Sequence, residues 1–232
     1  MPTLWRPQTP ARHPARRAGD GMNPDANVER FDALANEWDN DPQRVFMAQK
    51  VARAMRNALA PAGTETALEF GAGTGLVTLI MARHLARVTA LDASAGMLNV
   101  LRAKCAAKHL ENVDVITGNV PQAMPANRYD LIYASMVLRH VADVPALLGV
   151  LFDHLAPNGR VALADLDTED GSFHGAAKGV AHHGFDRATF ATWLRDAGFA
   201  EPQFTTAHTV QRAADDGSMH EYPIFLAVAR RS

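Results

Sequence analysis

The stretch Glu69-Phe70-Gly71-Ala72-Gly73-Thr74-Gly75 decides the fold. It follows a short apolar run, residues 66–70, and precedes a segment with apolar residues at helical spacing, so it marks a strand-to-helix junction. Glycines at such a junction let the backbone approach a ligand closely, and the start of the helix offers unpaired N–H groups. The pattern therefore predicts a ligand-holding loop at the edge of a sheet.

Strand and helix patterns alternate on both sides of this loop. The sequence predicts helices over residues 42–60, 74–84 and 94–109, and further helices beginning at Asp143 and Asp186. It predicts strands over residues 66–70, 88–91, 113–117, 129–135, 160–165, 203–211 and 222–229. Alternation of this kind is typical of a parallel sheet covered by helices. We therefore expect an α/β fold with a doubly wound, seven-stranded, mostly parallel sheet.

An acidic residue, Asp92, ends the second predicted strand. A carboxylate there can accept hydrogen bonds from both hydroxyls of a ribose. A nicotinamide enzyme would show Gly-x-Gly-x-x-Gly, but this chain has Leu76 where that pattern needs its third glycine. The residues thus count against a nicotinamide oxidoreductase on a similar fold, which stays as an alternative.

In these features the chain resembles the class I S-adenosylmethionine-dependent methyltransferases, of the broad group that includes ubiquinone-biosynthesis enzymes. The similarity covers roughly residues 27–230. It is carried by residues 31–39, 68–75, 91–94 with 97–98, 129–132, 137–143 and 155–160. The resemblance implies a Rossmann-like methyltransferase fold with a small helical N-terminal cap, and S-adenosyl-L-methionine as the cofactor.

The resemblance also assigns cofactor binding to residues near the ends of the predicted strands. They are Glu69, Gly71, Ala72, Gly73, Thr74, Gly75, Asp92, Ala93, Met97, Asn119, Val120 and Ser135. It implies that Glu69 lies near the methionine ammonium, Asp92 at the ribose and Asn119 at the adenine. Met97 fits a core position on a helix face as well as an adenine contact. Many relatives carry Asp where this chain has Asn119, and Tyr where it has Trp38.

No residue stands out as a catalytic base. A base is needed only when the methyl acceptor must lose a proton. The candidates are His140, Tyr133, His182 and His183, but for His140 we favour an ordinary histidine at a helix entry. His174, His182, His183 and the acidic residues of 165–170 would supply ligands to a metal. Histidines in polar loops are commonly solvated, however, so we expect no metal site.

The predicted acceptor is a small molecule, not a nucleic acid. Enzymes that methylate exocyclic amines of bases carry a proline motif after the fourth strand, whereas residues 133–136 read Tyr-Ala-Ser-Met. Enzymes that methylate a cytosine carbon need a nucleophilic cysteine in the site, whereas Cys105 falls on a helix away from the loop. Basic residues cluster only in residues 1–19, so the rest of the chain shows no basic stripe for binding phosphates. The alternative is a catalytically inactive S-adenosylmethionine-binding scaffold or regulatory protein, because this class shows no fixed catalytic residue.

Composition adds limits on organisation and location. The 232 residues carry a net charge of −2 and one cysteine, which excludes a disulfide framework within the chain and suits the cytoplasm. No apolar stretch is long enough to span a membrane. Residues 1–25 are expected to be a disordered tail, read either as a transit peptide or as a solvated extension before Met22. Residues 26–232 form the predicted methyltransferase domain: cap 27–60, cofactor-binding core 61–167, and lid loop with C-terminal strands 168–232.

Overall fold

The computed structural model describes residues 24–173, 179–213 and 218–231, so residues 1–23 of the predicted tail lie outside the described part. Its elements in chain order are α1 (Pro24–Leu34), the 3₁₀ helix η1 (Ala35–Asn40), α2 (Pro42–Leu59), β1 (Thr66–Phe70), α3 (Thr78–Met81), η2 (Ala82–His84), β2 (Arg87–Asp92), α4 (Ala95–Ala107), β3 (Val113–Thr117), β4 (Tyr129–Ser135), η3 (Leu138–His140), α5 (Val144–Asp153), β5 (Leu155–Leu166), α6 (Arg187–Asp196), β6 (Gln203–Ala213) and β7 (Met219–Arg230).

These strands form one seven-stranded sheet in the order β3-β2-β1-β4-β5-β7-β6. Strands β1 to β5 pair in parallel, whereas β7 runs antiparallel to both β5 and β6. The strand order reverses between β1 and β4, which is the place where doubly wound sheets bind ligands. The expected doubly wound, mostly parallel sheet is confirmed.

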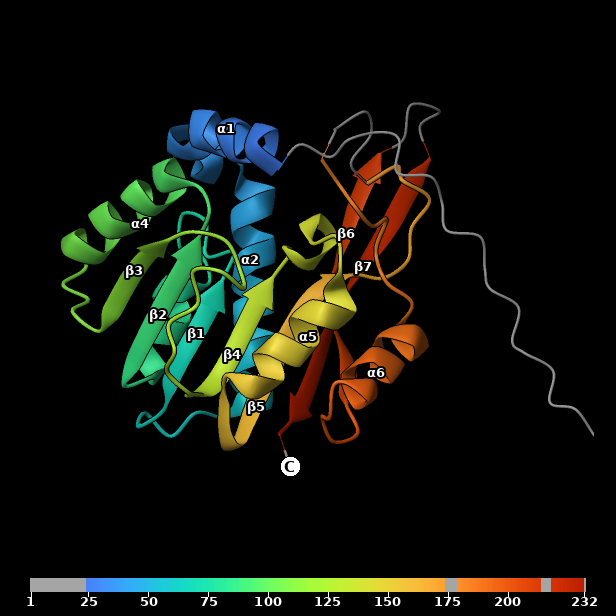
Figure 1. Cartoon of the computed structure of the whole chain (residues 1–232). Coiled ribbons are helices and arrows are strands. Elements are labelled where there is room, and N and C mark those ends of the chain that lie inside the picture. Colours follow the sequence, from blue (N-terminus) through green and yellow to red (C-terminus); the bar gives the residue numbers. More distant parts are fainter. Residues whose placement is uncertain (1–23, 174–178, 214–217, 232) are drawn as a thin grey trace, which may run out of the picture.

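Helices cover both faces of the sheet. Helices α2 and α3 pack on one face around Val51, Met55 and Met81, while α5 and α6 pack on the other around Leu148 and Phe190. Figure 1 shows α5 and α6 in front of the sheet and α2 behind it. It also shows α1 across the end toward which the parallel strands point. The N-terminal helices therefore cover the carboxyl edge of the sheet.

Four predicted helix starts are confirmed by side-chain caps. The carboxylate of Asp41 accepts hydrogen bonds from two backbone N–H groups at the start of α2. Ser94, Asp143 and Asp186 cap α4, α5 and α6 in the same way. Each cap satisfies a backbone donor that has no partner within its helix. These local signals are why the helix starts could be predicted.

The prediction of a helix over residues 74–84 was wrong in its extent. The α-helical part is only Thr78–Met81, followed by a short 3₁₀ helix. Gly73 and Gly75 have positive φ angles of 55° and 83°, which a right-handed helix does not contain. The loop therefore continues further toward the C-terminus than the apolar spacing indicated.

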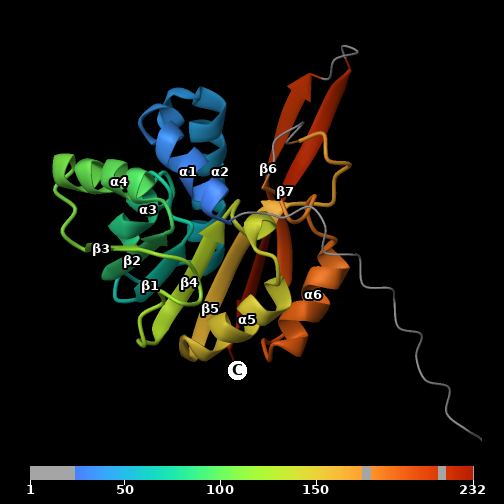
Figure 2. The same ribbon diagram turned by 45° about the horizontal axis from the view of Figure 1, so that its top comes forward.

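The last strands are longer than expected. Strand β5 begins at Leu155 rather than at Arg160, and its pairing with β4 is irregular there, since Tyr129 pairs with Leu155 and Leu131 with Arg160. Strands β6 and β7 form a long hairpin that projects past the rest of the sheet (Figure 2). Among the described residues, no helix is long and apolar enough to cross a membrane.

Candidate functional site

The glycine loop is built so that one of its glycines faces open space. A Cβ added at Gly75 would lie 2.3 Å from a side-chain carbon of Leu101, so this position is packed against α4. A Cβ at Gly73 would meet no heavy atom within 4 Å. The missing side chain of Gly73 thus leaves room for another molecule to approach the backbone.

Asp92 joins this loop to the end of β2. Its Oδ2 accepts a hydrogen bond from the N–H of Gly73, and its Oδ1 accepts one from the N–H of Ser94, both at 2.8 Å. Burial raises the pKa of this carboxyl above its ordinary value, and the two N–H donors oppose the rise. Each carboxylate oxygen has a second lone pair, so Asp92 can still accept from a ligand.

Glu69 lies beneath the loop, with a carboxyl group that is almost fully buried. Burial raises its pKa to about 8, although the nearby hydroxyls of Thr78 and Tyr133 act in the opposite direction. Its Oε2, the Thr78 hydroxyl and the Tyr133 hydroxyl all lack a hydrogen-bond partner of normal geometry. The hydroxyls of Thr78 and Tyr133 are thus close enough to affect the pKa of Glu69, but they form no well-aligned hydrogen bond with it. At neutral pH the carboxyl is protonated, and the three groups have unused bonding capacity.

The N-terminal cap is docked on α4 through Asp32. Its Oδ1 accepts a hydrogen bond from the Ser94 hydroxyl and another, of 2.8 Å, from the N–H of Gly96. These bonds lower the pKa of Asp32. A Cβ at Gly96 would lie about 3.1 Å from backbone atoms of Asp32, so the close approach of α1 depends on this glycine.

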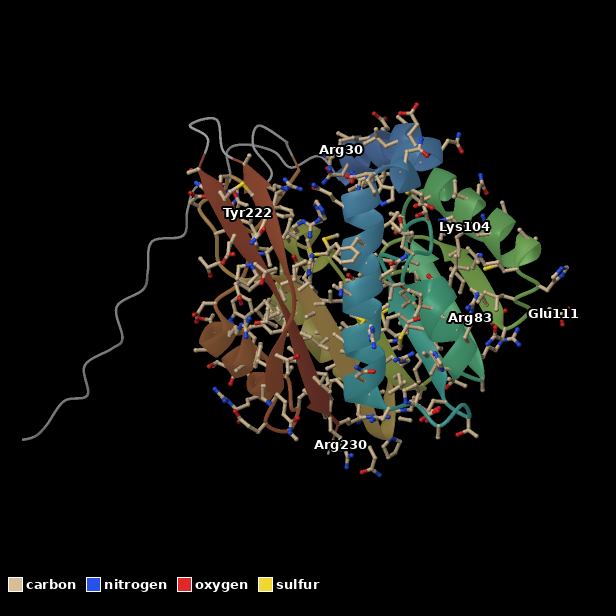
Figure 3. All side chains as sticks on the ribbon, turned by 180° about the vertical axis from the view of Figure 1, so that it is seen from behind. Arg30, Arg83, Lys104, Glu111, Tyr222 and Arg230 are labelled. Carbon is tan, nitrogen blue, oxygen red and sulfur yellow. The ribbon has the colours of Figure 1, made fainter. Side chains whose placement is uncertain are left out.

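A second acidic residue, Asp39, fastens η1 to the glycine loop. It accepts a hydrogen bond of 2.6 Å from the Thr74 hydroxyl and forms an ion pair with Lys104. Lys104 in turn donates to the carbonyl of Thr74 at 2.8 Å. Figure 3 shows Lys104 on α4, beside the cap. Trp38 stays within the cap, where its ring packs against that of Phe31 with the ring centroids 5.5 Å apart. Nothing local in the sequence indicated these docking contacts.

The residues expected near the adenine lie at the same edge of the sheet. Ala93 is half-buried after β2, and Met97 is buried on α4, as its core interpretation requires. Asn119 and Val120 follow β3 through Gly118, whose N–H donates to the Asp92 carbonyl at 2.8 Å. Ala72 is likewise tied to β2 by its N–H. The structure therefore brings these predicted positions together.

Ser135, which the resemblance assigns to cofactor binding, ends β4 and is half-buried. Met136 follows it with a φ of 59°, in the left-handed region that few residues other than glycine adopt. Val137 then packs against Gly71, where an added Cβ would lie 2.6 Å from its Cγ2. A strained turn after β4 thus closes against the glycine loop.

The four candidate bases do not lie together. Tyr133 is fully buried, and its pKa is raised well above its ordinary value, first by burial and then by Glu69, so its phenol stays neutral. His183 is exposed and lies 3.3 Å from Glu169. His182 Nε2 and the carbonyl of Val141 share a hydrogen bond of 2.9 Å.

His140 is the candidate base nearest the cap. Its Nδ1 lies 2.8 Å from the carbonyl of Gly179, and its ring packs edge-on against Phe31. Because a carbonyl only accepts, Nδ1 carries the proton and Nε2 the lone pair. Burial, and then the charge of Arg139, lower the pKa of His140 to about 4.

The structure contains no group of three or more metal-ligating side chains among the residues that it describes. His174 lies outside those residues. His182 and His183 are adjacent in the chain, but His182 contacts Val141 whereas His183 contacts Glu169. Among the described residues, the histidines and acidic residues that the sequence offered as metal ligands therefore do not come together as such a group.

Comparison with known proteins assigns the family. The methyltransferase domain family matches residues 41–214. An ubiquinone biosynthesis O-methyltransferase of Xanthomonas axonopodis pv. citri (strain 306) is 31% identical over 192 residues, which span 75% of this chain and 80% of the relative. The chain belongs to this methyltransferase family. The predicted family and the class of enzyme are thereby confirmed.

Two further proteins are similar to this methyltransferase, one in its fold and one in its sequence. A solved complex of DhpI with SAH has a TM-score of 0.67 at 22% identity, and the match covers 89% of this chain and 95% of that protein. A trans-aconitate 2-methyltransferase of Deinococcus radiodurans is 32% identical over 143 residues, covering 61% of this chain and 49% of the relative. The methyltransferase depends on S-adenosylmethionine, as the sequence predicted.

Proposed function

We propose that the methyltransferase transfers the methyl group of S-adenosylmethionine to a small-molecule acceptor. The observation that carries the proposal is the open glycine loop at Gly73 between two acids, the buried Glu69 and the half-buried Asp92. The cofactor site that we propose comprises Glu69, Gly71, Ala72, Gly73, Thr74, Gly75, Asp92, Ala93, Met97, Asn119, Val120 and Ser135.

These residues fit the parts of the cofactor. The free lone pairs of Asp92 suit the two ribose hydroxyls, while its bonds to Gly73 and Ser94 hold it in place. Glu69 has an unpaired buried oxygen that suits the ammonium of the methionine part. The bound cofactor supplies an electrophilic methyl group on a positively charged sulfur. The protein orients the acceptor beside that group and excludes water.

The cap supports a small acceptor. Asp32 and Asp39 hold α1 and η1 over the carboxyl edge of the sheet, so a ligand there is covered rather than open to a large polymer. The stretch after β4, residues 133–136, lacks the proline motif of enzymes that methylate base amines. The names of two relatives, an ubiquinone biosynthesis O-methyltransferase and a trans-aconitate 2-methyltransferase, also refer to small molecules.

Proton removal from the acceptor has limited support in this site. His140 presents a neutral imidazole with its lone pair on Nε2, but a pKa of about 4 makes it a weak base. Tyr133 is buried and holds its proton. An acceptor whose attacking atom is already unprotonated therefore fits these residues best.

Two measurements test the proposal. Calorimetry should show binding of S-adenosylhomocysteine and no response to NAD. Labelled S-adenosylmethionine incubated with the protein and a cell metabolite extract should then label a small molecule. Binding without any transfer would favour an inactive scaffold, and labelling only of added tRNA or duplex DNA would refute the acceptor class.

A further inference from the structure

Three segments meet around His140 and form what we call the arginine niche. It consists of Arg30 and Phe31 of α1, Arg139 and His140 of η3, and Gly179. The hydrogen bond from His140 to Gly179 and the contact between the His140 and Phe31 rings, 5.7 Å between centroids, hold these segments together. Asn27 of α1 also donates to the Gly179 carbonyl at 2.8 Å. The niche therefore lies where the cap closes over η3.

The niche adjoins the proposed methyl-transfer position. Val137 leads into η3 and packs directly against Gly71 of the glycine loop. Strands β1 and β4, which end at Phe70 and Ser135 just before these two residues, flank the reversal point of the sheet. Any acceptor must lie beside the reactive end of the cofactor, so an acceptor would contact the residues of this niche.

Two guanidinium groups in the niche have buried donors without acceptors. The Nε atoms of Arg30 and Arg139 are inaccessible to solvent, and neither has a hydrogen-bond partner. Buried polar groups in folded proteins almost always have partners, because an unpaired donor loses its hydration without compensation. Two such donors in one place indicate that a hydrogen-bond acceptor from another molecule belongs there.

The charges of the niche do not balance. Arg139 is paired with the fully buried Asp165 at 3.2 Å. Arg30 forms no ion pair with any other residue in the described part of the chain. Both arginines act on His140, which stays neutral at physiological pH. The niche thus carries one excess positive charge, and Figure 3 shows Arg30 at the end of the molecule where α1 lies.

We infer that the arginine niche binds a carboxylate of the methyl acceptor, with Arg30 as the ionic partner and Arg139 as a second donor. The inference rests on the proposed function and names the substrate class of the same site. A planar carboxylate matches the donor geometry of a guanidinium, and its single negative charge equals the excess charge of the niche. A phosphate ester would bring close to two negative charges, more than the niche compensates.

Chemical fractionation tests whether the methyl acceptor carries a carboxylate charge. A metabolite extract is passed over an anion exchanger at pH 7, and each fraction is assayed for label transfer from S-adenosylmethionine. Acceptor activity should be retained and eluted by salt. It should survive phosphatase treatment and disappear when carboxylates are converted to amides. Activity in the flow-through, or activity destroyed by phosphatase, would overturn the inference.

A matched pair of variants tests the residue. With the salt-eluted acceptor, Arg30→Gln should raise KM by about tenfold or more, because it removes a charge-assisted contact. Its affinity for S-adenosylhomocysteine should not change, which also reports that the variant is folded. Arg83→Gln, at an exposed position on η2 (Figure 3), should behave as the wild type.

An unchanged KM in a folded Arg30→Gln protein would remove Arg30 from acceptor binding and refute the inference, while leaving the methyltransferase reaction intact. If the wild type binds S-adenosylhomocysteine but labels no fraction, the proposed function itself fails, and the carboxylate site fails with it.

Discussion

Replacing Glu69 by Gln removes a buried ionisable group and nearly preserves the shape of the side chain. Burial raises the pKa of Glu69 from 4.5 to about 8 on folding. An acid with a raised pKa destabilises the fold once the pH exceeds its ordinary value. The loss begins near pH 4.5, grows by about 1.4 kcal/mol per pH unit and is complete near pH 8.

At pH 7 this loss amounts to about 3 kcal/mol of the free energy of unfolding. The Glu69→Gln protein has no proton to lose, so at pH 7 it should be more stable than the wild type by up to that amount. For a domain of this size the melting temperature should rise by roughly 6–12 °C. Near pH 4, where Glu69 is protonated in both states, the two proteins should melt alike.

Cofactor binding should show the opposite effect. A carboxylate that pairs with the cofactor ammonium must first release its proton. Between pH 6 and 7, where the free protein holds that proton, the Kd for S-adenosylhomocysteine should fall about tenfold, and the fall should level off above pH 8. Glu69→Gln should bind more weakly than the wild type at pH 8, with no dependence on pH from this group.

Calorimetry in buffers of different ionisation enthalpy counts the proton released on binding, and thermal melts between pH 4 and pH 8 measure the stability. The matched control is Glu111→Gln, which removes an exposed carboxylate far from the site (Figure 3). If the wild type binds S-adenosylhomocysteine without proton release at pH 7, or if Glu69→Gln releases the same proton, the assignment of Glu69 is refuted.

Four other changes have defined outcomes. Asp92→Ala should weaken S-adenosylhomocysteine binding about tenfold or more in calorimetry, because a hydrogen bond to a charged group contributes about 1.5–3 kcal/mol; an unchanged Kd would make Asp92 structural. Gly75→Ala should lower the melting temperature more than Gly73→Ala, because a Cβ at Gly75 would meet Leu101. Among the molecules that remain folded, Gly73→Ala should weaken S-adenosylhomocysteine binding more than Gly75→Ala, because only Gly73 faces open space. Asp32→Ala should lower the free energy of unfolding by about 1 kcal/mol in urea, because the N–H of Gly96 in the first turn of α4 loses its acceptor. Deleting residues 1–21 should change neither melting temperature nor affinity; aggregation of the shortened protein would contradict this.

The sheet and the glycine loop could be predicted because their signals are local. Strand runs, N-caps and the glycine pattern each lie within a few residues, and the doubly wound sheet followed from the alternation of strands and helices. The helix after the loop was placed too early, because apolar spacing at Leu76 and Leu79 resembles a helix even where Gly75 has a positive φ. Periodicity reports which face is apolar, not whether the backbone is helical there.

Contacts between distant segments could not be predicted. Asp32 meets Ser94 across 62 residues, and Asp39 meets Thr74 across 35. Either acid, considered alone, resembles an ordinary charged residue on a solvated helix. Only the docking of the cap on α4 gives them partners. The charge excess at Arg30 is hidden in the same way, because it depends on which carboxylates reach it after folding.

Most of the unsatisfied buried polar groups among the described residues gather where the sequence placed the ligand; Glu169, in the segment after β5, is the exception. Glu69 and Tyr133 lie under the glycine loop, and Arg30 and Arg139 lie beside the turn after β4. Met136, with its left-handed backbone, lies between Tyr133 and Arg139 in the chain. A core selected for stability alone would pair or remove such groups, because each costs free energy when buried. A site that binds a cation through Glu69 and an anion through Arg30 needs them unpaired until its ligands arrive, so the same groups that weaken the free protein give it affinity.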